Sequence, residues 1–262
     1  MRVDRVDRGN VGGGGVADRD HRRIIANLLG ALAALALGPT AAIAAADLER
    51  VEVLVTRGTN EFRAEQGLGR LEPQAALERA ASEFAAYMAR TDRYGHAADG
   101  NQPADRAQAK GYQYCWVAEN ISYQFSSAPF GTEELARRFV EGWKNSPGHR
   151  RNMVDPDAVH MANAVARSPS SGKYYGVQMF GRPRSSSIEF RVSNVARSPV
   201  RYRLGDEEFS LRTLQERVHT VCTPPVVTFV DAGNREGRTF RPSNGERLRV
   251  EGDRRLVVRS GR

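Results

Sequence analysis

Residues 142–153 read GWKNSPGHRRNM, and this stretch decides the fold of the chain. It closes an apolar stripe that recurs at helical spacing and consists of Leu135, Phe139 and Trp143. Thr132 stands where the N-cap of that helix is expected, with two glutamates in its first turn. The Ser-Pro-Gly tripeptide inside the quoted stretch ends the helix, because serine, proline and glycine together favour a turn.

Two further helices are predicted upstream of this stretch. The first has an apolar stripe of Leu48, Val51, Val55 and Phe62, and Gly67 ends the pattern. The second has a stripe of Leu77, Ala81, Phe84 and Met88. Pro73 stands where a first-turn proline is expected, and Gly95 closes the second helix. The segment before residue 142 is therefore mainly helical.

The spacing of apolar residues along the sequence changes from Ala158 onward. Apolar residues then occur in short runs, which are separated by SPSSG at 168–172 and GRP at 181–183. Such runs with tight connections predict β-strands. Helices followed by antiparallel strands, without strand–helix alternation, indicate an α+β fold.

Four motifs occur in order along this segment: YGH at 94–96, AENI at 118–121, the quoted stretch at 142–153, and YYGVQMFG at 174–181. In order and spacing they resemble the CAP superfamily (cysteine-rich secretory proteins, antigen 5 and pathogenesis-related 1; the SCP domain). The resemblance is strongest to the bacterial branch, whose hallmark is similar to W-x-N-S-P-G-H-R, and it covers about residues 48–183. It implies an α-β-α sandwich around a three-stranded antiparallel sheet.

The resemblance also implies a central cleft lined by two histidines and two acidic residues. The histidines match His96 and His149, and the acidic residue of the second motif matches Glu119. The second acidic position falls on Ser146. The sequence therefore retains three of the four cleft positions, and the loss of one carboxylate weakens a catalytic interpretation.

Three interpretations of His96, Glu119 and His149 remain open. Two imidazoles and one carboxylate match the ligands of a divalent metal such as zinc, with one open position. Either histidine, assisted by Glu119, is also suited to general acid–base catalysis. The third interpretation is structural, with these side chains joining loops by hydrogen bonds. No serine or cysteine lies in a nucleophile motif, so no catalytic residue is assigned and the balance is against an enzyme.

Three aromatic side chains near these motifs, Trp143, Tyr174 and Phe180, are predicted to belong to the core. Asn120 is predicted to anchor backbone beside the cleft. His160 and His219 have no supporting context, so both are interpreted as structural or exposed.

Residues 187–262 predict a second, small antiparallel β module. Gly205-Asp206 forms a turn between short alternating runs, and Asn244-Gly245 is a hairpin signal between Phe240 and the run at 248–250. Gly252-Asp253 marks a further turn, and Pro224-Pro225 is expected outside any central strand. The chain is therefore divided into a leader at 1–44, a CAP domain at 45–186 and this module at 187–262.

The positive charge is concentrated outside the CAP-like segment. The chain has 39 Lys and Arg against 31 Asp and Glu, a formal net charge of +8, but residues 45–186 have a net charge of only +1. Residues 187–262 contain 15 basic and 10 acidic side chains. A nucleic-acid binder concentrates basic charge on its working module, so nucleic acid is not an expected partner. An acidic partner is expected at the C-terminal module, if anywhere.

The N-terminal segment is predicted to be an export signal. Residues 24–38 read IIANLLGALAALALG, two arginines precede them, and the small-x-small tripeptide Ala42-Ile43-Ala44 follows. Together these features are typical of a secretory signal peptide, and the mature protein is then periplasmic or secreted and begins near Ala45. No other stretch of the chain is apolar for long enough to span a membrane.

The two cysteines, Cys115 and Cys222, fall one in each predicted module. In an oxidising compartment they can form a disulfide, which the sequence alone does not test. The expected function is non-enzymatic binding outside the cytoplasm, through the polar cleft or an adjacent apolar groove. The ligand is expected to be a lipid, a glycan or a protein. The alternative is a metal-dependent hydrolase that acts on an envelope polymer or peptide.

Overall fold

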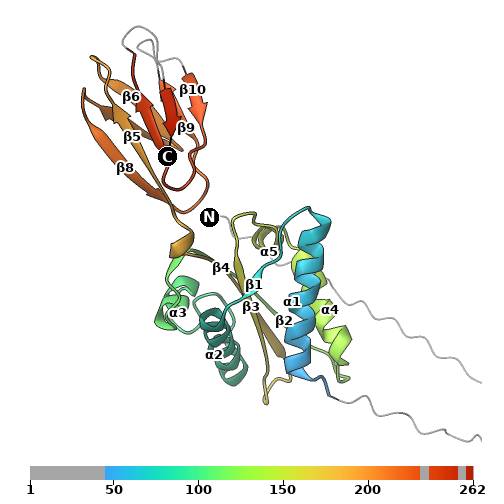
Figure 1. Cartoon of the computed structure of the whole chain (residues 1–262). Helices are drawn as coiled ribbons and strands as arrows, with labels where there is room; N and C mark the ends of the chain where they lie inside the picture. The colour runs from blue at the N-terminus through green and yellow to red at the C-terminus, as the bar shows by residue number, and fades with distance from the viewer. Residues whose placement is uncertain (1–44, 231–235, 253–257, 262) are drawn as a thin grey trace, which may run out of the picture. The chain divides into compact units, whose positions relative to one another are not determined.

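A computed structural model of the chain describes residues 45–230, 236–252 and 258–261 (Figure 1). The predicted leader at 1–44 lies outside the described residues. None of the described helices is long and apolar enough to cross a membrane.

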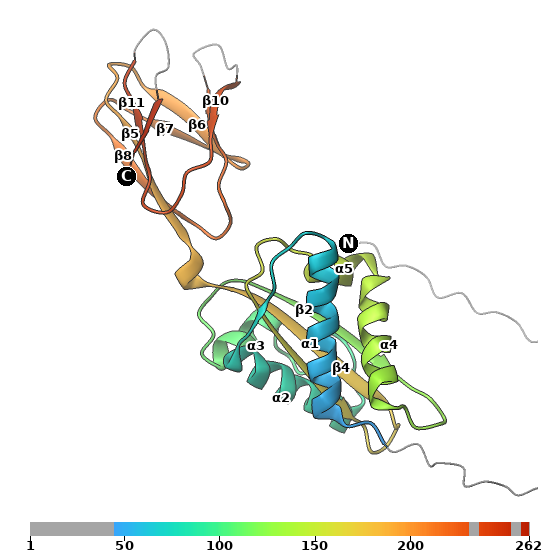
Figure 2. The same cartoon turned by 45° about the vertical axis from the view of Figure 1, so that its right-hand side comes forward.

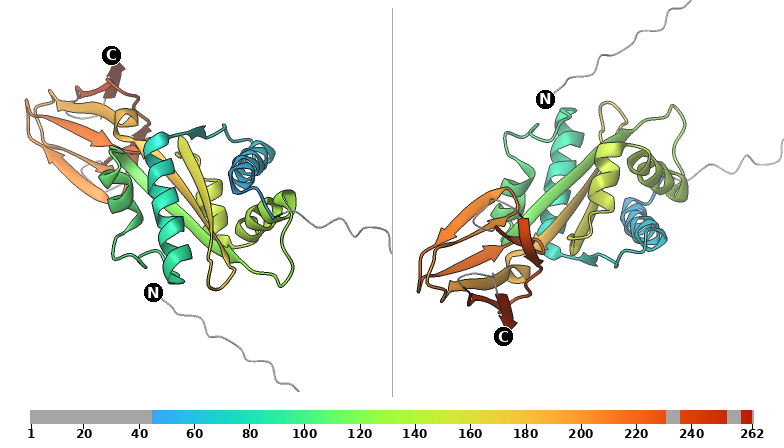
Figure 3. Two further views of the ribbon diagram at one scale, coloured as in Figure 1. Left: turned by 90° about the horizontal axis from the view of Figure 1, so that it is seen from below. Right: turned by 90° about the horizontal axis from the view of Figure 1, so that it is seen from above.

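The N-terminal segment is an α-β-α sandwich, as predicted. Its helices are α1 (Leu48–Glu65), α2 (Ala75–Thr91), α3 (Pro103–Ala109), α4 (Thr132–Lys144) and α5 (Pro147–Met153). Its strands are β1 (Glu72–Pro73), β2 (Tyr114–Gln124), β3 (His160–Arg167) and β4 (Tyr174–Pro183). The strand order is β1-β3-β4-β2, with α2 and α3 on one face of the sheet and α1 and α4 on the other (Figure 3). The last three strands are antiparallel, and the two-residue β1 adds a parallel edge to β3.

Two apolar cores hold this sandwich together, one on each face of the sheet. The helical stripe of α2 is buried against one face, and Leu77, Phe84 and Met88 are each at most 1% exposed. The stripes of α1 and α4 bury the other face, where Phe139 and Trp143 lie. Tyr174 and Phe180 are buried on the same side, so the three predicted core aromatics are confirmed.

The ends of the helices differ from the predicted ends. Pro73 lies in β1 beside Met161 instead of opening α2, because the chain first adds a short parallel strand to the sheet. Gln74 is the N-cap of α2, and its side chain accepts a hydrogen bond from the Ala76 N–H. The helix ends at Thr91, four residues before Gly95, because the next residue adopts the left-handed conformation of a C-cap.

The start of α4 also differs by one residue. Gly131 is its N-cap and Thr132 is its first residue. The Thr132 hydroxyl is unavailable for capping because it accepts a hydrogen bond from the backbone N–H of Asp47, at the start of α1. A tertiary contact between two helix ends has replaced the local cap that the sequence predicts.

The C-terminal segment forms two four-stranded sheets around one apolar core. Its strands are β5 (Ile188–Asn194), β6 (Val200–Leu204), β7 (Glu207–Leu211), β8 (Glu216–Val221), β9 (Val227–Val230), β10 (Glu236–Phe240), β11 (Arg247–Val250) and β12 (Val258–Gly261). The strand orders are β10-β9-β6-β7 and β12-β11-β5-β8. The pairing is antiparallel, as predicted, except that β11 runs parallel to β5. The division of the chain at residues 186 and 187 itself stays a prediction.

The turns of this module are partly as predicted. Gly205-Asp206 joins the antiparallel pair β6 and β7, and Pro224-Pro225 lies between β8 and β9. The prediction of a hairpin at Asn244-Gly245 is wrong, because β10 and β11 belong to different sheets. The turn instead contacts β5, where the Gly245 N–H donates to the Glu189 carbonyl and the Asn244 side chain accepts from the Glu189 N–H. The turn predicted at Gly252-Asp253 extends beyond the described residues.

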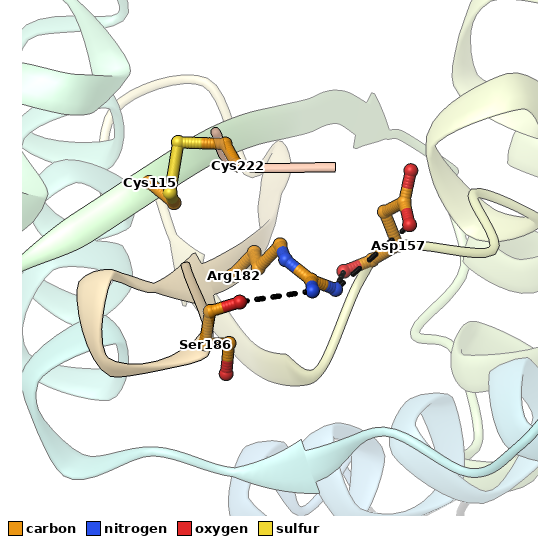
Figure 4. Close-up of a disulfide and its surroundings, with 5 residues drawn as sticks. All are labelled: Cys115, Asp157, Arg182, Ser186 and Cys222. Carbon is orange, nitrogen blue, oxygen red and sulfur yellow. Dashed lines mark hydrogen bonds and ion pairs between the residues drawn. A yellow bond between two sulfur atoms is a disulfide. The ribbon is translucent and has the colours of Figure 1, made fainter. Parts of the chain in front are cut away.

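The disulfide between Cys115 and Cys222 is present, with a Cα–Cα distance of 5.3 Å (Figure 4). It joins the residue directly after β8 to the start of β2, the strand that carries the AENI motif at 118–121. Near it, the Arg182 guanidinium donates to the carbonyls of Asp157 and Ser186. The chain that leaves β4 is thereby fixed beside the disulfide.

Candidate functional site

The buried carboxylate of Glu119 is the centre of the predicted cleft. Glu119 lies on the edge strand β2, and its side chain is 0% exposed. One carboxylate oxygen lies 2.8 Å from His96 Nδ1, and the other accepts a hydrogen bond of 2.7 Å from Arg106 Nη2. His96 comes from the loop between α2 and α3, and Arg106 comes from α3. Both oxygens of the buried carboxylate are therefore engaged.

Arg106 is the functional residue that sequence reasoning missed. Its guanidinium also donates to the Asp99 carboxylate and to the carbonyls of Asn101 and His96, at 2.8–2.9 Å. The guanidinium lies over the Phe84 ring, 3.6 Å from the ring centroid. Its four Nη hydrogens thus have four acceptors, all of which lie within 13 residues of it in the sequence. No local motif marks an arginine in a short helix as a partner for a later strand.

This arrangement determines how His96 meets solvent. With a carboxylate as its partner, His96 Nδ1 carries a hydrogen, so in the neutral ring Nε2 is the free acceptor. The His96 side chain is 49% exposed, whereas Glu119 and Arg106 behind it are buried. An ion pair inside the protein is favourable only when hydrogen bonds satisfy both groups. Here both carboxylate oxygens and both Nη groups of the guanidinium have partners, whereas the buried Arg106 Nε has none. These residues therefore present one oriented imidazole to solvent, supported by a buried ion pair.

His149 is the second imidazole of the cleft, and it lies in α5. Its pKa is lowered from the ordinary value, first by burial and then by the positive charge of His96. Because the charged form is disfavoured on both counts, His149 is neutral near pH 7.

The outer edge of β2 holds the elements around the cleft in place. Asn152, in α5, donates from its side-chain amide to the Glu119 carbonyl at 3.3 Å and to the Asn120 side chain at 2.9 Å. The Asn120 amide in turn donates to the His149 carbonyl at 3.2 Å, which confirms that this residue anchors backbone beside the cleft. An edge strand leaves backbone groups unpaired, and here side chains satisfy them.

A buried polar network extends from this point through the sandwich. The Asn120 amide donates to Gln178, and Gln178 donates to Thr59 and Asn163, with donor–acceptor distances of 2.9–3.1 Å. These residues lie on β2, β4, α1 and β3, and all four are buried. A fully paired buried network of this kind fixes one arrangement of the elements that contribute it.

Comparison with known proteins identifies the segment that carries this geometry. The model of the cysteine-rich secretory protein family, CAP, matches residues 56–180. This segment is a CAP domain. It is 28% identical over 118 residues to the uncharacterized membrane protein YlbC of Bacillus subtilis (strain 168), a match that covers 45% of this chain and only 30% of that protein.

Solved structures are similar to about half of the chain. An outer surface protein from Borrelia burgdorferi has 21% identity and a TM-score of 0.44, and the match covers 52% of this chain and 93% of the other. An extracellular protein containing an SCP domain from Bacillus anthracis str. Ames has 20% identity and a TM-score of 0.44. That match covers 52% of this chain and 41% of the other.

The fourth cleft position of the CAP domain carries no charge. Ser146 is the half-buried N-cap of α5, and it makes no side-chain capping bond. Glu141, the nearest acidic residue before it, is exposed and pairs with Lys144 at 3.1 Å. Arg150, which follows His149, lies over the Phe62 ring at 4.7 Å from its centroid. The CAP domain therefore has a single carboxylate, Glu119, at these four positions.

The predicted metal ligands do not come together as a set of three. Among the residues that the structure describes, no group of three His, Cys, Asp or Glu side chains is arranged to hold a metal ion. Glu119 in particular is turned toward His96 and Arg106. A carboxylate in that place orients a metal-binding imidazole from behind instead of ligating the metal itself. Metal binding by His96 and His149 stays a prediction.

The two other histidines of the described residues, His160 and His219, have tyrosine partners. His160 Nδ1 lies 2.9 Å from the Tyr112 hydroxyl, and His219 Nε2 lies 2.7 Å from the Tyr202 hydroxyl. His219 is buried in the core of the β module, and burial lowers its pKa. Neither belongs to the cleft of the CAP domain.

The CAP domain also has a groove between α1 and α4, which run side by side in Figure 2. The groove has a volume of about 330 Å³. Its apolar lining consists of Leu54, Gly58, Phe62, Ala136 and Val140. Charged side chains also line it, among them Arg57, Glu61 and Lys144. That a ligand binds in an apolar groove stays a prediction.

Proposed function

We propose that this protein is an exported, non-enzymatic binding protein that recognises its ligand at the cleft of the CAP domain. The observation that carries this proposal is the hydrogen-bonded chain from Arg106 through Glu119 to His96. It holds a half-exposed imidazole in one orientation, which suits directional recognition of a polar ligand.

The chemistry of the cleft favours binding over catalysis. Glu119 is poorly suited to act as a general base itself, because both oxygens of its carboxylate already accept hydrogen bonds. The fourth position, Ser146, supplies no second carboxylate. Both cysteines are in the disulfide, so neither is a nucleophile. What remains at the surface is a pair of imidazoles, one of which is neutral near pH 7.

Export is supported by two independent features. The disulfide between Cys115 and Cys222 is of the kind that persists in oxidising compartments. The sequence before Ala45 has the three parts of a secretory signal. N-terminal sequencing of the exported protein is expected to begin near Ala45, and a start upstream of Ile24 contradicts cleavage.

The four histidines after residue 45 provide an internal control for a binding test, because two lie in the cleft and two lie outside it. Imidazole nitrogen resonances of the purified exported protein are recorded with fatty acids, oligosaccharides and peptides. A ligand of the cleft is expected to shift the signals of His96 and His149 and to leave those of His160 and His219 in place. The Glu119→Gln variant is expected to weaken that response.

Activity assays on the same purified protein test the hydrolase alternative. The binding proposal predicts no turnover of peptides, esters or glycans with or without added zinc. Zinc-dependent hydrolysis that disappears in the His96→Ala/His149→Ala double variant overturns it.

A second candidate function is lipid binding in the groove between α1 and α4. Its volume of about 330 Å³ and its apolar lining support this candidate. Palmitate bound there is expected to leave all four histidine signals in place. Palmitate that shifts the His96 and His149 signals instead assigns the lipid to the cleft.

A further inference from the structure

A row of exposed aromatic side chains continues from the cleft along β2. This aromatic row consists of Tyr94, Tyr123 and Phe125, whose exposed fractions are 48%, 45% and 60%. Only three other large apolar side chains of the described chain are exposed to this degree: Val53, Leu214 and Val218. Exposed apolar groups that gather in one place indicate a binding surface, whereas single ones do not.

The row starts at the cleft itself. Tyr94 is two residues before His96, and its hydroxyl donates to the Ile121 carbonyl on the outer edge of β2 at 3.0 Å. Burial raises the pKa of Tyr94, with smaller contributions from Tyr123 and the negative charge of Glu119. Because side chains alternate along a strand, Glu119 and Tyr123 point to the same face of β2.

The two tyrosine rings form a corner on this surface. Their centroids are 5.3 Å apart and their planes meet at 87°. The buried ring of Tyr175 packs beneath both, at 6.5 Å from Tyr94 and 5.9 Å from Tyr123. Lys173 Nζ lies 4.9 Å from the centroid of the Tyr123 ring. The corner therefore combines flat apolar faces with a cation.

The row ends in a hollow of mixed lining, in which Ala128, Pro129 and Pro169 lie among the polar groups. Phe125 lines a surface pocket of about 540 Å³ beside the turn between β3 and β4. Hydroxyl and guanidinium groups share its lining, from Ser126, Ser127, Arg167, Ser170 and Ser171. The surface thus runs from imidazoles, over aromatic rings, to a hollow rich in hydrogen-bonding groups.

Asp92 holds this surface in one shape. It follows α2 in the left-handed conformation, and its carboxylate accepts hydrogen bonds from Ser170, Ser171, Ser168 and Tyr175 at 2.6–3.1 Å. These bonds lower the pKa of Asp92 well below its usual range. They tie the turn between β3 and β4 to the end of α2. A surface fixed in advance loses less entropy when a ligand binds.

We propose that the aromatic row and the hollow extend the cleft into an elongated site for a β-1,4-linked glycan. The proposal deepens the binding function proposed above and rests on it. A pyranose ring has a flat C–H face that packs on an aromatic ring, because its hydrogens meet the negative π face. Its hydroxyls need partners at the edge, and serines, Arg167 and Lys173 provide them.

The composition of the surface distinguishes a glycan from an acyl chain. An acyl chain would cover the Ser127 hydroxyl and the Arg167 guanidinium of the hollow without replacing their hydrogen bonds to water, which costs free energy. A linear β-1,4-linked chain presents C–H faces and hydroxyl edges along its whole length. The alternation of rings and polar groups from Tyr94 to the hollow matches that pattern.

Isothermal titration of the purified exported protein with cellohexaose and with chitohexaose tests the proposal. At least one hexasaccharide is expected to bind the wild type. Tyr123→Ala and Phe125→Ala are each expected to weaken binding by about tenfold. Tyr123→Phe keeps the ring and is expected to stay within about twofold. Val53→Ala, at an equally exposed site on α1, is the matched control and is expected to change nothing.

Two results overturn the glycan site. One is that neither hexasaccharide binds the wild type; the other is that binding is unaffected by both alanine variants. If the His96 and His149 signals still respond to another ligand, the binding function stands and only this extension fails. If no ligand moves those signals, the binding function fails as well. A protein partner lost on Tyr123→Ala, with no hexasaccharide bound, assigns the surface to protein recognition instead.

Discussion

Replacing Arg106 by methionine tests the buried ion pair on which the cleft depends. The Arg106 and Glu119 side chains are 6% and 0% exposed, so the carboxylate cannot be stabilised by water when the guanidinium is removed. Methionine keeps an unbranched apolar side chain of similar length beside the Phe84 ring, over which the guanidinium lies in the wild type. The variant therefore isolates the loss of charge and hydrogen bonds.

The expected cost follows from burial. Breaking a buried pair by removing one partner costs about 3–5 kcal/mol, since the remaining charge is left uncompensated. For a domain of this size that corresponds to a fall in melting temperature of about 6–20 °C. Removing an exposed arginine from an i,i+4 pair costs less than about 1 kcal/mol. Arg138, which is 52% exposed and paired with Glu134, provides that comparison.

Tryptophan fluorescence is a suitable assay, because both tryptophans of the chain, Trp116 and Trp143, lie in the N-terminal sandwich. Urea unfolding followed at this signal is compared among the wild type, Arg106→Met and Arg138→Met. The Arg106→Met/Glu119→Gln double variant is expected to regain part of the stability, since it no longer leaves a stranded carboxylate. Equal costs for Arg106→Met and Arg138→Met refute the argument that Glu119 depends on Arg106.

Three further predictions concern the rest of the fold. Burial lowers the pKa of His219, so on acidification the unfolded chain takes up a proton at this imidazole before the folded chain does. The stability of the β module therefore falls as the pH drops below about 6.5. Calorimetry from pH 7.5 to 5 should show this loss of stability, and a His219→Phe variant should lose less stability over the same range. Alanine at Gly176 places its β-carbon 2.5 Å from a buried phenylalanine ring, so it should lower the free energy of unfolding measured in urea by about 1–3 kcal/mol. Alanine at Gly142 is the control, since its β-carbon meets no atom within 4 Å and should not destabilise the protein. Cys115 and Cys222 are 107 residues apart, and reduction of the disulfide between them should lower the free energy of unfolding by about 2–4 kcal/mol. Urea unfolding with and without dithiothreitol measures this change. An unchanged midpoint of the urea transition would show that the disulfide constrains neither the folded nor the unfolded state.

The elements that could be predicted are those whose signal is local. The stripes of α1, α2 and α4 repeat at helical spacing, and each is buried in the structure. Strand β2 carries no comparable signal, because Glu119 and Asn120 interrupt its apolar run although both are buried. Their burial is tolerated only because partners such as Arg106, His149 and Gln178 arrive from elsewhere in the chain.

Helix ends and strand partners were the least predictable features, for the same reason. Thr132 is a residue type that favours the N-cap, but its hydroxyl accepts a hydrogen bond from the backbone N–H of Asp47, at the start of another helix. The Asn244-Gly245 turn has the composition of a hairpin, but the strands on either side join different sheets. In both cases a tertiary contact prevailed over a local preference of comparable free energy.

By itself, the sequence determined the three long helices, the α+β class, the CAP motifs and the candidate cleft residues His96, Glu119 and His149. Only the tertiary structure decided that Arg106 pairs with Glu119, that β11 pairs with β5, and that the rings of Tyr94 and Tyr123 meet edge to face. The physical reason is that periodicity reports which side of an element is apolar. It does not report which distant group that side meets, and a buried charge or an edge strand is stabilised only by such a group.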